Sequence, residues 1–112
     1  MAIIKKEEFS VEDVELAEFA RALGHPARIA ILKTLAEKSE CVCGEIVEIL
    51  PLAQATVSQH LKELKKAGLV KGRVSGVKTC YCLNWEVFSR FAELFKGYTG
   101  NIACCNKDQS CC

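Results

Sequence analysis

The sequence predicts a single, mainly helical domain in which one β-hairpin separates the last helix from the helices before it. Three observations favour this fold class. Apolar residues recur at helical spacing in several segments before residue 68. β-branched and aromatic residues flank a central "SG" at residues 75–76, and a further amphipathic segment follows them. The predicted order of elements is α-α-α-α-β-β-α, and 112 residues allow one domain with one modest core.

The first two helices are predicted from their end signals. "FSVEDVELAEFARALG" reads as a helix that Ser10 can cap, with Asp13 three residues later, and that Gly24 ends. "HPARIAILKTLAEKS" places Pro26 in a first turn, where its missing N–H costs nothing. His25, directly before that proline, is interpreted as a cap.

The next two helices form a compact pair. "GEIVEIL" is a short helix stopped by Pro51, and "QATVSQHLKELKKAG" is a longer one that Gly68 ends. Two short helices joined by a tight turn, the second rich in polar and basic residues, are typical of a helix-turn-helix.

The last elements complete the architecture. "LVKGRVSGVKTCYCLN" predicts a two-stranded hairpin, and Asn84 can cap the final helix "WEVFSRFAELFKGY". That helix carries three phenylalanines, more than so small a core needs, so it and the first helix are expected to form a homodimer surface. The sequence therefore predicts a winged helix-turn-helix domain over residues 1–100 and a cysteine-rich tail over residues 101–112.

The charge distribution favours nucleic acid as the partner. Residues 1–50 carry six basic and ten acidic side chains, whereas residues 51–112 carry nine basic and four acidic ones. The basic excess lies mainly in the fourth helix and the hairpin. A chain divided in this way can bind nucleic acid with one positive face.

The second helix of a helix-turn-helix enters the major groove with its N-terminal turns. Glutamine can pair with adenine there, serine and threonine can reach bases or phosphates, and the lysines that follow are expected to meet phosphates. Basic residues of the wing would meet phosphates or enter the minor groove. The residues expected to contact double-stranded DNA are Gln54, Thr56, Ser58, Gln59, His60, Lys62, Lys65, Lys66, Lys71, Arg73 and Lys78.

Cysteine usage and hydropathy suggest a compartment. The N-terminus lacks the apolar run of a signal peptide, and no stretch approaches the ~20 apolar residues of a membrane span. We therefore expect a cytoplasmic protein without a membrane partner. In that reducing compartment, eight cysteines indicate metal or redox chemistry more than structural disulfides.

Three stretches carry a family resemblance: "ALGHPARIAIL", "QATVSQHLKELKKAGLVKGRVSG" and "TCYCLN". Together they resemble the ArsR/SmtB family of metal- and metalloid-responsive repressors, from about Glu18 to Asn84. The resemblance implies a homodimer that binds DNA without any cofactor. A symmetric dimer would place two reading helices about one DNA turn apart, so the operator is expected to be an imperfect palindrome. The resemblance also implies release when a thiophilic or transition metal binds, and no enzymatic activity.

The tail is the first candidate for the effector site. Some members of the family carry "CC-x5-C" just after the last helix, and Cys104, Cys105 and Cys111 reproduce that spacing, with Cys112 as a spare ligand. Trivalent arsenic and antimony are soft and favour thiolates. Three thiols satisfy an inorganic ion, and two satisfy an organoarsenical with one carbon substituent.

Cys41 and Cys43 are the second candidate, because "ECVCGEI" resembles the "CVC" of many arsenic, cadmium and lead sensors. Counted from "TVSQHL", however, the family's thiols fall on Val42 and Gly44. Either the segment slides by one residue or these thiols are core residues. Cys80 and Cys82, two apart on a strand, are expected to act as small structural hydrophobes.

Several other functions remain open at this point. A redox-sensing repressor could form a disulfide between the 104/105 and 111/112 pairs, since vicinal cysteines make strained partners. A cadmium- or lead-sensing repressor would share the fold. The family's site of Asp and His on the last helix cannot form, because "WEVFSRFAELFKGY" contains neither residue. A thiol oxidoreductase lacks its C-x-x-C motif, and a metal buffer does not need a basic reading helix.

Overall fold

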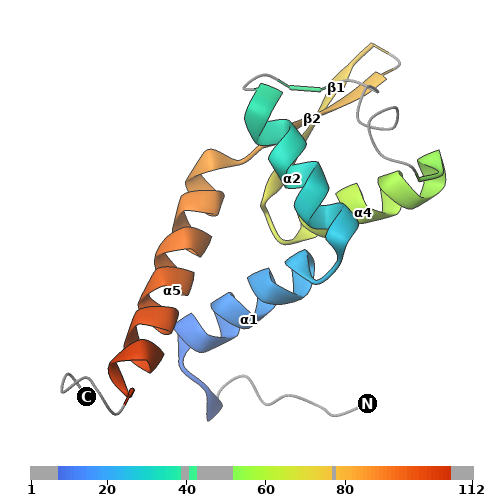
Figure 1. The fold of residues 1–112 in the computed structure, drawn as a ribbon. Helices are drawn as coiled ribbons and strands as arrows, with labels where there is room; N and C mark the ends of the chain where they lie inside the picture. Colours follow the sequence, from blue (N-terminus) through green and yellow to red (C-terminus); the bar gives the residue numbers. More distant parts are fainter. Residues whose placement is uncertain (1–7, 39–40, 43–51, 77, 107–112) are drawn as a thin grey trace.

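The structure is a computed structural model that describes residues 8–38, 41–42, 52–76 and 78–106. Its elements follow the predicted order, and the mainly helical fold with a two-stranded antiparallel hairpin is confirmed (Figure 1). The predicted helix at 44–50 lies outside the described residues. The elements are α1 (Val11–Leu23), α2 (Pro26–Lys38), α4 (Gln54–Lys66), β1 (Val70–Ser75), β2 (Lys78–Leu83) and α5 (Trp85–Cys104).

Three helices begin with the side-chain caps that the sequence predicts. Ser10 Oγ accepts a hydrogen bond from the Asp13 backbone N–H at 3.1 Å. His25 Nδ1 accepts one from the Ala27 N–H at 3.0 Å, and Asn84 Oδ1 accepts one from the N–H of Val87 at 3.3 Å. Each cap satisfies an amide that has no partner within its helix, which fixes where α1, α2 and α5 begin.

Helix α4 ends in a turn that requires a left-handed residue. Gly68 has φ +83°, its N–H donates to the Lys65 carbonyl, and the Leu69 N–H donates to the Leu64 carbonyl. These two bonds form a Schellman motif, in which glycine adopts positive φ without the clash of a Cβ. The turn directs the chain from α4 straight into β1, so the wing follows the reading helix directly.

The core lies between α2, α4 and the inner face of the hairpin. Its most buried side chains are Ile31, Leu35, Val57, Leu64 and Leu69, each no more than 2% exposed. These side chains occupy one face of each helix, so the opposite face of α4 is directed to solvent. Figure 1 shows α4 at the edge of the molecule, below the hairpin.

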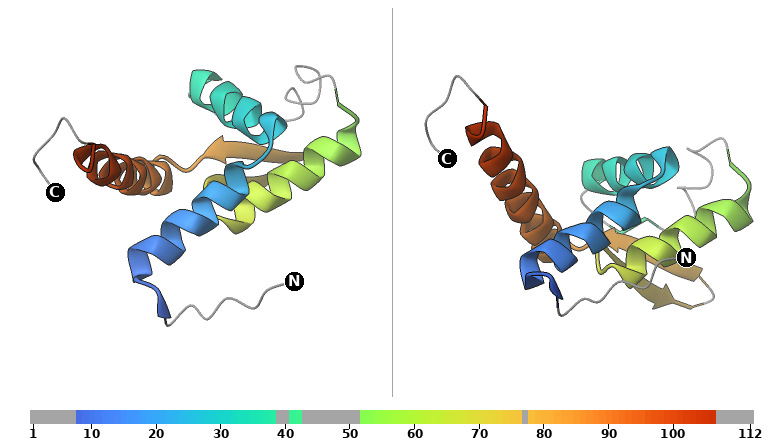
Figure 2. Two further views of the ribbon diagram at one scale, coloured as in Figure 1. Left: turned by 60° about the horizontal axis from the view of Figure 1, so that its bottom comes forward. Right: turned by 90° about the horizontal axis from the view of Figure 1, so that it is seen from below.

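Helix α5 packs beside α1 and away from the hairpin (Figure 2). The Phe91 ring meets that of Phe19 edge-on at 5.6 Å, and both Nε and Nη2 of Arg90 donate to the Glu15 carboxylate, at 3.0 and 3.2 Å. No residue of α5 is fully buried. The helix continues to Cys104 and so includes the first residues of the predicted tail.

Candidate nucleic-acid interface and thiol sites

The outward face of α4 carries most of the predicted DNA contacts. Gln59, Lys62 and Lys66 are exposed and lie at positions i, i+3 and i+7, which share one face of a helix. That face is opposite to the buried Val57 and Leu64. The predicted contact residues on α4 that the structure leaves exposed are Gln54, Thr56, Ser58, Gln59, Lys62, Lys65 and Lys66.

One acidic residue interrupts this basic face. Gln59 Nε2 donates to Glu63 Oε1 at 3.4 Å, and Lys66 Nζ lies 3.9 Å from the same oxygen. The carboxylate therefore holds the side chain of a base-reading candidate and partly neutralises a phosphate-contacting one. Glu63 is not among the residues predicted from the sequence, although its position three residues before Lys66 is a recognisable ion-pair spacing.

We expect Glu63→Gln to tighten DNA binding by roughly two- to tenfold, because it removes a negative charge that would approach the phosphates. Fluorescence anisotropy of a labelled duplex measures this affinity at fixed salt. Glu37→Gln, an exposed glutamate of α2, is the matched control and should leave the affinity unchanged. Weaker binding by Glu63→Gln would show that Glu63 supports DNA binding by positioning Gln59 and does not weaken it by repelling phosphates.

The wing extends the basic surface. Lys71 and Arg73 are exposed on β1, on the same side as their partners Cys82 and Cys80 in β2. A Cβ at Gly72 would lie only 3.0 Å from Lys65 Nζ, so the Lys65 side chain packs against β1 at its one residue without a side chain. Because side chains alternate across a strand, this contact lies on the face of β1 opposite to Lys71 and Arg73. Lys78 begins β2, but its side chain lies outside what the structure describes.

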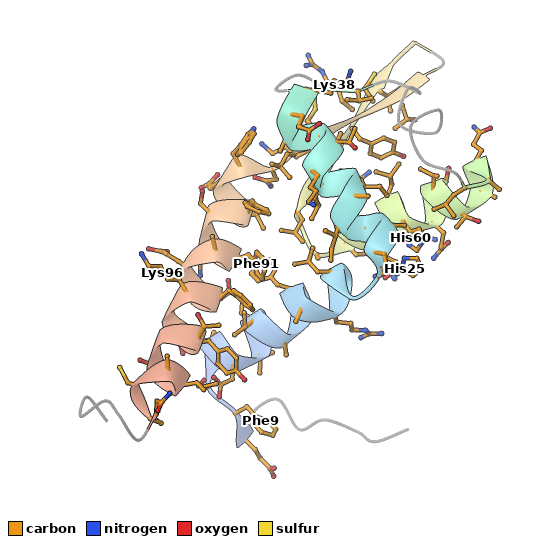
Figure 3. All side chains as sticks on the ribbon, viewed as in Figure 1. Phe9, His25, Lys38, His60, Phe91 and Lys96 are labelled. Atoms are coloured by element: carbon orange, nitrogen blue, oxygen red, sulfur yellow. A yellow bond between two sulfur atoms is a disulfide. The ribbon has the colours of Figure 1, made fainter. Side chains whose placement is uncertain are left out.

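His60 corrects one prediction. Its side chain is 7% exposed, its Nδ1 accepts a hydrogen bond from Arg28 Nε at 3.1 Å, and its ring centroid is 4.3 Å from that of His25. Arg28 Nη1 also donates to the Ala22 carbonyl at 3.1 Å. His60 therefore packs α4 against the junction of α1 and α2, as Figure 3 shows, and does not present its ring to DNA.

The environment of His60 lowers its pKa, first through burial and then through the nearby positive charges of His25 and Arg28. His60 therefore binds a proton more readily in the unfolded chain than in the folded protein. Stability from neutral His60 is present above the unfolded pKa of about 6.5 and is lost as pH falls toward the lower folded pKa. Urea unfolding from pH 7.5 to 5 should show a steeper loss in the wild type than in His60→Gln. Equal slopes would contradict this.

One cysteine of the hairpin is joined to the segment that follows α2. Cys41 and Cys82 form a disulfide, with Cα atoms 4.4 Å apart. The next residue pair, Val42 and Tyr81, exchanges two backbone hydrogen bonds, at 2.8 and 2.9 Å. This antiparallel pairing sets Cys41 directly opposite Cys82 in a close, non-hydrogen-bonded pair. Cys43 lies outside the described residues.

These bonds correct two expectations. Cys82 is not simply a small hydrophobe, and Cys41 is cross-linked to the wing instead of forming a dithiol with its sequence neighbour. Cys80, 4% exposed, is also engaged in a disulfide. The sequence pointed away from structural disulfides, and it contained no signal for the pairing of residues 41 and 82, which depends on strand register.

The predicted tail site begins on the last turn of α5. Cys104 is half-buried and engaged in a disulfide, and Cys105 is exposed, with its Sγ 3.4 Å from the Asn101 carbonyl. Cys111 and Cys112 lie outside the described residues. Within the ranges that the structure describes, no three His, Cys, Asp or Glu side chains gather as a metal site. Helix α5 contains neither Asp nor His, so its donors for a soft ion are sulfurs.

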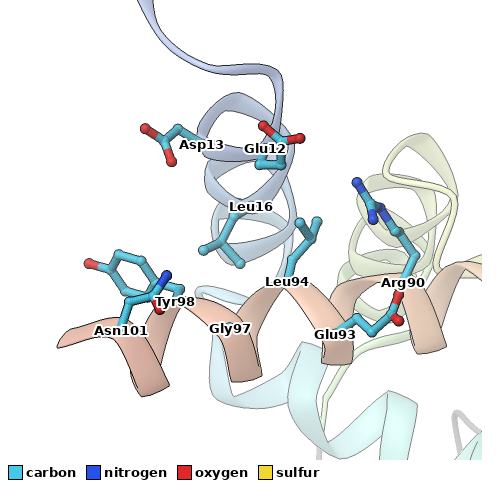
Figure 4. Close-up of a pocket in the computed structure, with 9 residues that line it drawn as sticks. All are labelled: Glu12, Asp13, Leu16, Arg90, Glu93, Leu94, Gly97, Tyr98 and Asn101. Carbon is cyan, nitrogen blue, oxygen red and sulfur yellow. The ribbon is translucent and has the colours of Figure 1, made fainter. Parts of the chain in front are cut away.

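A groove of about 420 Å³ lies between α1 and α5 (Figure 4). Its floor is apolar and its rim is charged, and Tyr98 at one end is 51% exposed. Phe95 and Ile102, on the same helix, are 49% and 55% exposed. This is the surface predicted to form the dimer. The groove is lined by Glu12, Asp13, Leu16, Arg90, Glu93, Leu94, Gly97, Tyr98 and Asn101.

Comparison with known proteins identifies the class. Residues 25–71 match the family model described as "Bacterial regulatory protein, arsR family". A transcriptional regulator from Methanocaldococcus jannaschii is 46% identical over 81 residues, which is 71% of this chain and 86% of that protein. The arsenical resistance operon repressor of Staphylococcus xylosus is 36% identical over 72 residues, covering 64% of this chain and 68% of that one.

A solved structure described as a possible transcriptional regulator for arsenical resistance aligns with TM-score 0.63 and 25% identity, over 70% of this chain and 80% of that chain. The protein therefore belongs to the arsR family and has its winged helix-turn-helix fold. It is a DNA-binding transcriptional repressor of that family and not an enzyme. No helix of the described ranges is long and apolar enough to cross a membrane.

Proposed function

We propose that this protein is a homodimeric repressor that binds a palindromic operator and is released when trivalent arsenic or antimony binds cysteine thiolates. The observation that carries the DNA-binding part is the exposed polar and basic face of Gln59, Lys62 and Lys66 on α4, followed along the chain by the exposed Lys71 and Arg73 of β1. Polar side chains at the start of a reading helix can contact base edges, and the cations around them can neutralise phosphates. We assign its action to the cytoplasm.

The dimer is supported by the exposed apolar side chains of α5. Phe95, Tyr98 and Ile102 lie on the helix that also holds α1 through the Arg90–Glu15 ion pair. A second copy covering the groove between α1 and α5 would bury these side chains around a two-fold axis. Two α4 helices related by that axis would then read half-sites about one turn of DNA apart, which requires an imperfect palindrome.

The effector part is supported by the donors at the end of α5. Cys104 and Cys105 are adjacent at the last turn and the cap of α5, where two sulfurs can reach one soft ion once Cys104 is reduced. They suffice for an organoarsenical with one carbon substituent, and Cys111 would complete a three-sulfur site for an inorganic ion. The relative in Staphylococcus xylosus is named as an arsenical resistance operon repressor, which favours arsenic over other soft effectors.

The position of this site gives a route to DNA. An ion that binds at the end of α5 acts on the helix that we assign to the dimer contact, and so on the separation of the two reading helices. Couplings of about 1–3 kcal/mol, common in allosteric proteins, would weaken DNA binding 5–150-fold. Because thiol coordination releases protons, the apparent affinity for the effector should rise with pH over the thiol titration range.

A redox-sensing repressor is the second candidate, and the disulfide of Cys104 favours it. In that case an oxidant would replace the metalloid as the signal. A cadmium- or lead-sensing repressor is the third, since these ions also bind thiolates. Peroxide, arsenite and cadmium titrations of the operator complex separate the three.

The experiment is operator binding by the reduced protein, with and without arsenite, measured by fluorescence anisotropy. We expect Cys104→Ser/Cys105→Ser to bind the operator as the wild type does and to lose the arsenite response. Cys41→Ser/Cys43→Ser is the matched double variant and should keep the response. If the second variant loses the response and the first keeps it, the sensor lies at the other cysteines. If arsenite and an organoarsenical both leave the wild-type complex intact, the metalloid proposal fails.

A further inference from the structure

A disulfide ties the segment before the helix-turn-helix to the wing. Cys41 lies beyond α2, and β2 lies between this segment and β1, because Tyr81 pairs with Val42 on one side and with Gly72 on the other. At residues 41–42 the chain therefore runs antiparallel to β2, joined to it by a single bridge on the side away from β1. The Cys41–Cys82 bond crosses the first of the two pairings.

The bond lies on the same face as the wing's cations. In antiparallel strands, directly opposite residues point to the same side, and Cys82 is opposite Lys71 while Cys80 is opposite Arg73. The other side of the sheet is the core side, where Val70 and Leu83 are buried. Cys82 and the two cations that we assign to DNA thus share one surface.

The positive charges around Cys82 would also make the reduced thiols of Cys41 and Cys82 reactive. Neighbouring lysine and arginine charges favour thiolate over thiol, and the thiolate is the form that oxidants attack. Neither Cys41 nor Cys82 is fully buried. Both residues therefore keep part of their surface in contact with solvent.

We propose that Cys41 and Cys82 are a reversible redox modification site that sets the DNA affinity of the wing, with the disulfide as the tighter-binding form. A peroxide oxidises the two thiols to the disulfide, and its two oxygens leave as two water molecules. A dithiol reductant restores both thiols and becomes a disulfide itself. This inference rests on the proposed DNA binding but concerns a site distinct from the tail.

The expected direction follows from preorganisation. Simultaneous contact by α4 and by the wing requires both to be held in one relative position, and ordering a loose element on binding costs affinity. The disulfide holds β2 covalently to the chain that leads into the helix-turn-helix. Among the described residues, the other bonds of this pairing are the two backbone hydrogen bonds between Val42 and Tyr81.

The test uses the full chain with Cys104, Cys105, Cys111 and Cys112 replaced by serine, so that the tail cannot respond. The probe is a labelled duplex selected from a random-sequence library by the oxidised protein. We expect reduction to weaken binding about 5–20-fold. Adding Cys41→Ser/Cys82→Ser should abolish this change, whereas adding Cys80→Ser, a matched cysteine of the same strand, should preserve it.

A second measurement needs no substitution in the pair. If DNA binds the disulfide form tenfold more tightly, DNA must stabilise the disulfide by the same factor, which is about 30 mV in its reduction potential. Thiol labelling of Cys41 and Cys82 in glutathione buffers, with and without the duplex, measures this shift. This change in reduction potential tests the proposal even if Cys41→Ser/Cys82→Ser does not fold.

Several results would overturn the inference. These are equal affinities in the two redox states, tighter binding on reduction, a change that persists in Cys41→Ser/Cys82→Ser, or no shift of the potential with DNA. Stoichiometric zinc retained by the reduced protein and lost in that variant would assign the pair to a metal site instead. If neither redox state binds any selected duplex, the proposed DNA binding fails as well.

Discussion

Lys62→Ala/Lys66→Ala is expected to weaken operator binding on the order of 10²–10³-fold at about 0.15 M salt. Both side chains are exposed on the outward face of α4, and a dimer would lose four phosphate contacts. Each contact releases about 0.9 of a counterion, so the slope of log affinity against log salt should become about 3–4 less steep. Base-reading residues are retained, so the preferred sequence should not change.

Anisotropy titrations at several salt concentrations give both the affinity and the slope. The control is Lys33→Ala/Lys96→Ala, which removes two exposed lysines from α2 and α5 and should leave both quantities unchanged. An unaltered slope in Lys62→Ala/Lys66→Ala would mean that α4 does not lie against the phosphates. The positive face would then serve another partner.

Leu64→Ala should lower the free energy of unfolding by about 2–5 kcal/mol. Leu64 lies on the inward face of α4 and is 0% exposed. Its carbonyl accepts the hydrogen bond from the Leu69 N–H that closes the turn into β1. Truncating this side chain leaves a cavity at the point where the reading helix, the core and the wing meet. A loss of this size is a large part of the 5–15 kcal/mol that stabilises an ordinary domain.

Urea unfolding of the oxidised protein measures this loss, with Val74→Ala as the control. Val74 is 76% exposed on the wing, and its truncation should change stability by less than about 0.5 kcal/mol. Equal stabilities for wild type and Leu64→Ala would contradict the assignment of the core. At temperatures where the variant remains folded, it should still bind the same duplex sequence, since no outward side chain is changed.

Local signals predicted most of the fold. Ser10, Asn84 and Gly68 act within a few residues of their own position, so the ends of α1, α5 and α4 could be read directly from the sequence. The hairpin could be read from Gly76, which has φ +64° at the predicted tip. The last helix was expected to end near Tyr98, but it continues to Cys104 through Gly100, a residue that weakens a helix without stopping it.

Contacts between distant parts of the chain could not be predicted in this way. His60 was assigned to DNA because it follows polar residues on a reading helix, but Arg28, 32 residues earlier, holds it inside the domain. Likewise the Cys41–Cys82 bond joins residues 41 apart through the pairing of Val42 with Tyr81. Spacing of cysteines along a sequence does not reveal such a register.

Capture of an effector by sulfur is proposed to release DNA from α4 and the wing. The most direct measurement is an arsenite titration of the operator complex formed by the reduced wild type and by a variant with all eight cysteines replaced by serine. We predict that the wild type dissociates and that the cysteine-free protein stays bound at every arsenite concentration. Dissociation of both proteins, or of neither, would contradict the account.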